Sequence, residues 1–301
     1  MKKLKYKITK RIIMDYFYTH SWNSIDNRLK NGTYNILSEM TGKPVEETKK
    51  IVGKLRRQRN KCSTMITKDN FRGLNILRGC KAGGVHKIEC KNCCFLETGQ
   101  KLSGRNTRSA SDYNKVLKMK NDGSNCRTWN GKHVIDYSVL KLLYNTKKQT
   151  NWILTYAGEI SLADYDTLYI LMQQPFRYLM HNFFFVTKEP EILLNKLLPV
   201  LRKIKEEGRD IKRLNNLHIV GSVGLNETKY RIDHVRRYDG FEKHIWFKGL
   251  LGPIIDPDLT GISTIRIGAD RGKYKRPMKQ QWVNDLIKLA RKQNVLAFHD
   301  K

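Results

Sequence analysis

The chain has 301 residues, which suits one large domain or two smaller ones, and 40% of them are hydrophobic. That share supports a packed core and excludes an intrinsically disordered protein. Lysine and arginine total 58 against 28 aspartates and glutamates, a formal net charge of +30. Packing does not require this excess, and it favours a polyanionic partner, with nucleic acid (DNA or RNA) first, over a merely solvated basic surface or an acidic protein partner.

The first 18 residues are basic like a signal peptide, but Asp15 interrupts their apolar run and no small-residue cleavage site follows. No apolar stretch reaches transmembrane length. We therefore expect a cytoplasmic protein without a membrane partner, and the sequence sets no oligomeric state. Thiols stay reduced in that compartment, so metal binding or redox chemistry suits clustered cysteines better than disulfides do.

Residues 1–61 are expected to form a small, basic, all-helical module that resembles a helix-turn-helix. A short helix carries Ile36, Leu37 and Met40, a turn follows at 41–44, and a second helix presents one apolar face with Val45, Ile51, Val52 and Leu55. Basic residues crowd the end of the second helix and are candidate nucleic-acid contacts: Lys54, Arg56, Arg57, Arg59 and Lys61. A helical hairpin that caps the main domain would show the same periodicity.

Residues 62–301 are expected to form the main domain, in which short apolar strands alternate with amphipathic helices. The expected strands are "NWILTYAG", "HNFFFVTK", "LHIVGSVG", "HIWFKGLLGP" and "STIRIGAD", and the helices include "EILLNKLLPVLRKIKEEG" and "QQWVNDLIKLARKQN". This alternation predicts an α/β fold with a parallel sheet, either a complete or a partial (β/α) barrel. Chemistry in such folds lies at the carboxyl ends of the strands, which here are 155–159, 187–188, 222–225 and 268–272.

Four of the six cysteines lie within sixteen residues, "GCKAGGVHKIECKNCC" (Gly79 to Cys94). A C-x2-C pair with Cys80 and either His86 or Cys94 would complete a tetrahedral Zn²⁺ site. Three thiolates would equally hold an iron–sulfur cluster. Cys62 and Cys126 stand alone and are expected to be small buried apolar residues or unpaired thiols. The cysteines by themselves leave zinc and iron–sulfur open.

From about Cys80 to the C-terminus, five motifs carry a resemblance. They are "GC…CKNC", "FFFVTKEPE", "VGSVGLNETKYRIDHVR", "GLLGPIIDPDLTGISTIRIGADRG" and "RPMKQQWVNDL". In this order they resemble a phage-encoded family of unassigned function that is similar to radical S-adenosylmethionine (SAM) enzymes and, distantly, to spore photoproduct lyase. The resemblance implies a radical-SAM-type partial barrel. It departs at Lys248-Gly249, where the family has a glutamate and a proline.

The resemblance implies that Cys80, Cys90 and Cys93 hold a [4Fe–4S] cluster, on a loop after a strand expected at Leu74–Leu77. Cys94 is the alternative third ligand. Three thiolates leave the fourth iron open to the amino and carboxylate groups of SAM. The cysteines alone favour a zinc site and an iron–sulfur cluster equally, and the resemblance favours the iron–sulfur cluster.

The same resemblance assigns a SAM site. Gly158 and Glu159 match the element that holds the SAM amine, and the turn with Gly268, Asp270 and Gly272 resembles the element near the adenosyl group. Ser222 and Asn226 would reach the ribose or carboxylate, and Lys188 would face a phosphate of the nucleic acid. The alternative for Glu159 is an ordinary strand-to-helix turn, and for the others a structural hydrogen bond.

The resemblance thus implies a radical-SAM enzyme that modifies or repairs nucleic acid for a phage or mobile element, in the cytoplasm of the host cell. The alternative is a nucleic-acid-binding protein without turnover, in which zinc or a cluster serves only as a structural staple.

Overall fold

The computed structural model describes residues 33–52, 71–81, 85–86, 88–90, 117–119, 127–155, 158–270 and 276–300. In the N-terminal part, α3 (Thr33–Thr41) is followed by a turn at Gly42, with φ of 61°, and by a second helical segment at 45–52. This agrees with the expected pair of helices. Leu37 is buried, whereas Ile36 and Met40 are exposed, so the three do not share one buried face. The basic residues expected at 54–61 lie outside the described residues.

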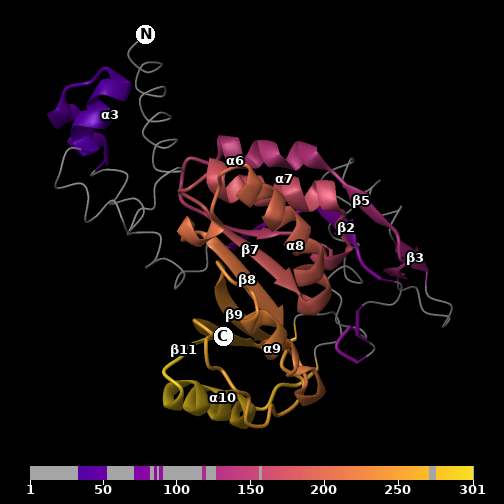
Figure 1. Cartoon of the computed structure of the whole chain (residues 1–301). Helices are drawn as coiled ribbons and strands as arrows, with labels where there is room; N and C mark the ends of the chain where they lie inside the picture. Colours follow the sequence, from indigo (N-terminus) through magenta and orange to yellow (C-terminus); the bar gives the residue numbers. More distant parts are fainter. Residues whose placement is uncertain are drawn as a thin grey trace.

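A seven-stranded, all-parallel sheet forms the body of the protein (Figure 1). Its strands, in spatial order, are β1 (Phe71–Leu74), β6 (Asn151–Leu154), β7 (Asn182–Thr187), β8 (Leu217–Ser222), β9 (Glu242–Lys248), β10 (Thr264–Gly268) and β11 (Leu296–His299). The spatial order follows the chain order, and the sheet curls into a half-barrel. The expected partial barrel is therefore confirmed, including all five strands named above.

The helices between the strands cover the outer face of the sheet (Figure 1). The α-helices are α6 (Lys141–Asn145), α7 (Tyr165–Arg177), α8 (Pro190–Glu206), α9 (Arg231–Arg236) and α10 (Gln280–Lys292). Short 3-10 turns lie at η3 (Tyr137–Leu140), η4 (Ile160–Leu162), η5 (Ile211–Arg213) and η6 (Asn226–Thr228). In α8 the residues Leu193, Leu197, Val200 and Ile204 recur at helical spacing, and all four are buried against the sheet. None of the described helices has both the length and the hydropathy that crossing a bilayer requires.

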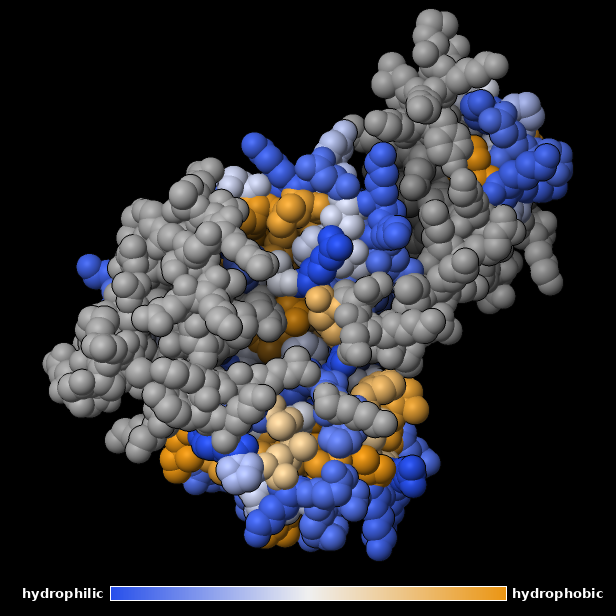
Figure 2. Space-filling view, turned by 180° about the vertical axis from the view of Figure 1, so that it is seen from behind, coloured by the Kyte–Doolittle hydropathy of each residue, from blue (hydrophilic) through white to orange (hydrophobic). Residues whose placement is uncertain are grey.

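Aromatic side chains meet across the concave face of the sheet. The ring of Phe71 on β1 lies 5.0 Å from that of Phe184 on β7 and 5.4 Å from that of Trp246 on β9. The guanidinium of Arg266 on β10 stacks 5.1 Å from the centre of the Phe71 ring. These contacts join strands that are far apart in the sheet, which the curl makes possible. Seen from behind, the surface is hollowed, with apolar residues at its floor (Figure 2).

The expected strand at Leu74–Leu77 is in fact two strands. β1 ends at Leu74, where the N–H of Ile76 donates to the Leu74 carbonyl at 2.9 Å and turns the chain. β2 (Leu77–Gly79) then leaves the main sheet and pairs antiparallel with β5 (His133–Ile135). A further hairpin of β3 (Leu117–Met119) and β4 (Arg127–Trp129) was not expected, and neither was β11. The turn places Cys80 directly after β2.

Candidate active site

The carboxyl end of β6 is joined to the strand that precedes Cys80. Gly79 and Gly158 form a parallel bridge, and the N–H of Glu159 donates to the Gly79 carbonyl at 3.1 Å. A Cβ on Gly158 would lie 2.8 Å from that carbonyl oxygen, so only glycine allows this approach. The structure therefore brings Cys80 and the Gly158-Glu159 pair to the same edge of the sheet.

The carboxylate of Glu159 is buried and links the ends of β6 and β7. It accepts hydrogen bonds from Thr187 Oγ1 at 2.5 Å, from the N–H of Lys188 at 3.1 Å and from the N–H of Ser161 at 3.3 Å. Burial raises the pKa of Glu159 above its ordinary value, although these hydrogen bonds oppose the change. A cation brought to this carboxylate would offset the cost of burying its charge, so the site suits an ammonium group. Within the described residues three donors reach the carboxylate, which has about four acceptor positions.

Cys90, in the loop after β2, lies beside Lys188, the residue that follows β7. Its Sγ accepts a hydrogen bond from Lys188 Nζ at 3.4 Å and from the N–H of His86 at 3.4 Å. Hydrogen bonds to sulfur are a normal feature of cluster-ligating loops, so the surroundings of this thiol fit that role. Lys188 thus contacts both Cys90 and Glu159, and its ammonium faces the cysteine loop. Cys93 and Cys94 lie outside the described residues, within which no group of three His, Cys, Asp or Glu side chains is arranged to hold a metal.

Sequence reasoning missed Glu89, the residue before Cys90. Its side chain is 3% exposed and accepts hydrogen bonds from the N–H of Gly224 at 2.7 Å, from Thr228 Oγ1 at 2.8 Å and from Arg231 Nη1 at 2.7 Å. Burial alone would raise the pKa of Glu89, but the charges of Lys188 and Arg231 with these hydrogen bonds outweigh it and lower the pKa. Arg231, 1% exposed, also donates to the Ser222 carbonyl at 2.7 Å. The sequence signal that could have pointed to Arg231 is its place within the motif "VGSVGLNETKYRIDHVR".

Asp270, at the end of β10, holds a second arginine against the cysteine loop. Arg276 donates from Nε to Asp270 Oδ2 at 2.8 Å and from its two terminal nitrogens to the carbonyls of Ile88 at 2.6 Å and Glu89 at 3.0 Å. Gly249 permits this arrangement, because a Cβ there would lie 2.6 Å from the Cα of Asp270. Asp270 therefore supports the loop, and Gly272 lies outside the described residues.

The chain matches a protein family over residues 72–301, well over half of its length. The family is DUF5131, described as a protein of unknown function. The chain belongs to this family. No curated protein and no solved structure matches it. The DUF5131 segment contains both cysteines that the structure describes, together with Glu89, Arg231 and Arg276.

Three other candidates in the DUF5131 segment make structural hydrogen bonds. Ser222 Oγ donates to the Lys248 carbonyl at 3.5 Å, which is a long contact. Asn226 Oδ1 accepts from the N–H of Ile255 at 2.9 Å, in the segment after β9. The carbonyl of Gly268 accepts from the N–H of Leu250 at 3.0 Å. All three residues lie at or just after the ends of β8 and β10, and these bonds hold the neighbouring loops in place.

Lys248, the last residue of β9, forms an ion pair with Asp300, which directly follows β11. Arg266 Nε donates to the other oxygen of Asp300 at 2.6 Å. Burial would raise the pKa of Asp300, but the hydrogen bonds and charges of Lys248 and Arg266 outweigh it and lower the pKa. The Asp300 carboxylate thus offsets the positive charges of Lys248 and Arg266 at this end of the sheet.

Proposed function

We propose that this chain is a radical-SAM-like iron–sulfur protein that modifies or repairs nucleic acid, in the cytoplasm of a cell that hosts a phage or mobile element. One observation carries the proposal: the loop that ends in Cys90 is fixed over the carboxyl ends of a parallel half-barrel. Cys80 enters the same edge from β2. Parallel α/β folds place their chemistry at this edge.

The residues at this edge suit the implied groups. Cys80, Cys90 and Cys93 would hold a [4Fe–4S] cluster, and when bound it would supply the electron that cleaves SAM. Glu159 would hold the SAM amine, since burial of its carboxylate favours a cationic partner. Lys188 Nζ donates to Cys90 Sγ at 3.4 Å, and this hydrogen bond would tune the cluster.

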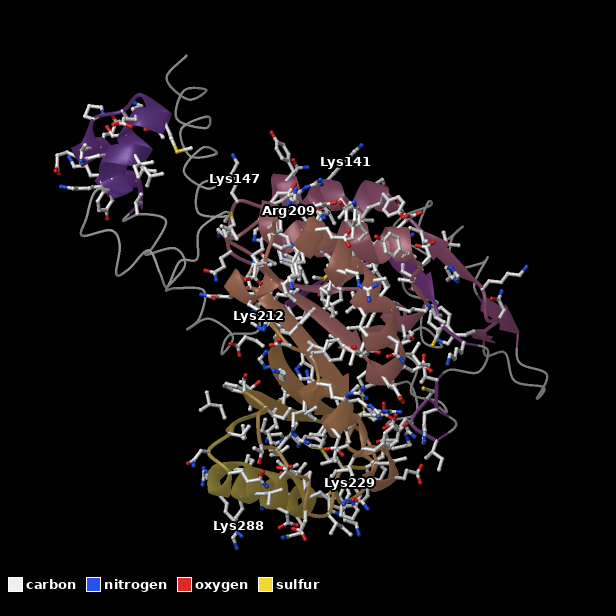
Figure 3. The ribbon with its side chains drawn as sticks, viewed as in Figure 1. Lys141, Lys147, Arg209, Lys212, Lys229 and Lys288 are labelled. Atoms are coloured by element: carbon white, nitrogen blue, oxygen red, sulfur yellow. The ribbon has the colours of Figure 1, made fainter. Side chains whose placement is uncertain are left out.

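Nucleic acid is the proposed substrate because of the net charge of +30. Basic side chains such as Lys141, Lys147 and Lys288 point outward from different parts of the described structure (Figure 3). Such a distribution attracts a polyanion over long range, so affinity should fall steeply as salt rises.

A second candidate is a nucleic-acid-binding protein whose metal, zinc or a cluster, is only a staple. The observation that favours it is that Asp270, Asn226 and Ser222 already make bonds within the protein. Side chains that hold neighbouring loops in place would be needed in a binding protein even if it never binds SAM.

Anaerobic purification with metal analysis and an ultraviolet–visible spectrum separates the two. The wild type should contain iron and sulfide and show a broad visible band, which a variant with Cys80, Cys90 and Cys93 all replaced by alanine should lack. Stoichiometric zinc, or no metal, would contradict the radical-enzyme proposal and favour the binding protein.

A further inference from the structure

Polar contacts join the described residues 88–90 of the cysteine loop to the half-barrel. Ile88 is 51% exposed and so contributes little apolar burial, whereas the adjacent Glu89 side chain is 3% exposed. A glutamate is seldom buried unless it is paired. Here Arg231 and two neutral donors, the N–H of Gly224 and the hydroxyl of Thr228, form hydrogen bonds to the carboxylate.

The groups that bind Glu89 come from the turn after β8, from η6 and from α9. The Ser222 carbonyl fixes Arg231 on one side of the carboxylate. On the other side Gly224 comes so close that a Cβ would lie 3.1 Å from Glu89 Oε1. The three donors lie close together in the chain but far from Glu89, since Gly224, Thr228 and Arg231 follow it by 135, 139 and 142 residues. The contact therefore selects one position of the loop.

The second attachment is independent of the Glu89 side chain. Arg276 binds the backbone carbonyls of Ile88 and Glu89, and Asp270 at the end of β10 orients its guanidinium. Two arginines from different elements thus hold consecutive residues directly before Cys90. A planar guanidinium with several fixed donors is suited to this task, because it restrains orientation as well as distance.

We propose that Glu89 and Arg276 are positioning residues that dock Cys90 at the strand ends before any metal is bound. The assignment of Cys90 as a ligand rests on the proposed function, but the docking itself does not. Preorganisation of the loop lowers the conformational cost of assembling the site. In this arrangement Arg231 and Arg276 affect the site only by fixing the position of Cys90. Neither arginine needs to touch a substrate.

The test is the alkylation rate of each cysteine in the full chain after metal removal under reducing conditions, with iodoacetamide as the probe. Trypsin separates Cys90 from Cys93 and Cys94 because Lys91 lies between them, so mass spectrometry resolves the sites. The variants are Glu89→Gln and Arg276→Gln. The control is Arg236→Gln, which removes an arginine on α9 that binds Asp258 and the Thr260 carbonyl instead of the loop.

We expect both loop variants to raise the Cys90 rate at least about tenfold, since alkylation follows the population of the opened loop. The Cys80 rate and the thermal unfolding of the half-barrel should change little, and Arg236→Gln should behave like the wild type. Glu89→Asp, which keeps the charge on a shorter side chain, should restore part of the protection.

An unchanged Cys90 rate in both loop variants would overturn the proposal. Equal acceleration at Cys80 and Cys90 would overturn it as well, because that pattern reports loss of the fold. If Glu89→Gln does not fold, Thr228→Val removes a single donor to Glu89 and should raise the Cys90 rate by a smaller factor. A protein without iron in which the loop variants still expose Cys90 would refute the proposed function and leave the docking intact.

Discussion

Gly79 and Gly158 pair as a parallel bridge that joins the strand before Cys80 to the end of β6. We expect Gly158→Ala to lower the free energy of unfolding by about 1–3 kcal/mol, because its Cβ would lie 2.7 Å from Leu77 Cδ2 and 2.8 Å from the Gly79 carbonyl. Urea unfolding measures this. Gly252→Ala is the control, since the nearest atom to its Cβ would be 3.8 Å away. Equal stability of the two variants would contradict the close approach.

Glu159→Gln keeps the shape of the side chain and removes its charge. If the proposed function holds, the variant should lose reductive cleavage of SAM while its nucleic-acid affinity stays within about twofold, since the proposal assigns that affinity to exposed basic side chains. Activity with reduced protein and a filter-binding titration measure the two quantities. Undiminished SAM cleavage in the variant would contradict the role of Glu159. A wild type that binds nucleic acid and never cleaves SAM would favour the binding protein.

Lys188 was expected to face nucleic-acid phosphate, but in the structure its ammonium lies 3.4 Å from Cys90 Sγ. We expect Lys188→Met to make the proposed cluster harder to reduce, because a positive charge beside it would stabilise the reduced form. A redox titration followed by visible absorbance measures the change, and Lys188→Arg should stay close to the wild type. A weaker affinity for nucleic acid with a salt slope smaller by about one would instead assign Lys188 to a phosphate contact.

Two buried histidines should make stability depend on pH. His218 Nδ1 lies 2.9 Å from His244 Nε2, and His244 Nδ1 lies 2.8 Å from Thr264 Oγ1. Burial lowers the pKa of His244 to about 4, and burial together with the neighbouring His244 lowers the pKa of His218 well below its ordinary value. The unfolded chain binds these protons from about pH 6.5 downward and the folded chain does not. Stability should therefore fall as pH drops from about 6.5 towards 4, by about 3 kcal/mol from His244, and His218 should add to the fall.

Urea unfolding at several pH values measures this slope. The double variant His218→Gln with His244→Gln should be less stable at neutral pH and much flatter in its pH dependence. His299→Gln is the control, because His299 is exposed. A double variant with the full wild-type slope would show that other groups cause the dependence.

Asp300 holds Lys248 and Arg266 at the last strand of the sheet. We expect Asp300→Asn to cost about 1–3 kcal/mol of stability, because it leaves two partly buried cations without their carboxylate. The loss should be present at neutral pH and shrink in acid, since the wild-type contribution disappears as pH falls through the lowered pKa of Asp300. Urea unfolding against Asp285→Asn, an exposed residue of α10, isolates the effect.

The secondary structure of the main domain could be predicted from the sequence because it depends on local periodicity. Phe183, Phe184 and Phe185 form a continuous apolar run that reads as a buried strand, and the leucines of α8 recur at helical spacing. The partial barrel follows from strands and helices that alternate along the chain. The break between β1 and β2 was missed because "LNIL" contains no strong turn signal, and the Leu74 carbonyl sets the turn.

The sequence by itself determined the charge, the cysteine spacing, the parallel α/β fold and the strand ends at which a site would form. Only the tertiary structure decided which side chains meet there. A glutamate between Ile88 and Cys90 looks solvated in sequence, yet it becomes buried because Arg231, 142 residues later, supplies the compensating charge. Lys188 and Cys90 are 98 residues apart, and only the curl of the sheet and the docking of the loop bring them together. Such contacts depend on folding in three dimensions, and no local pattern in the chain specifies them.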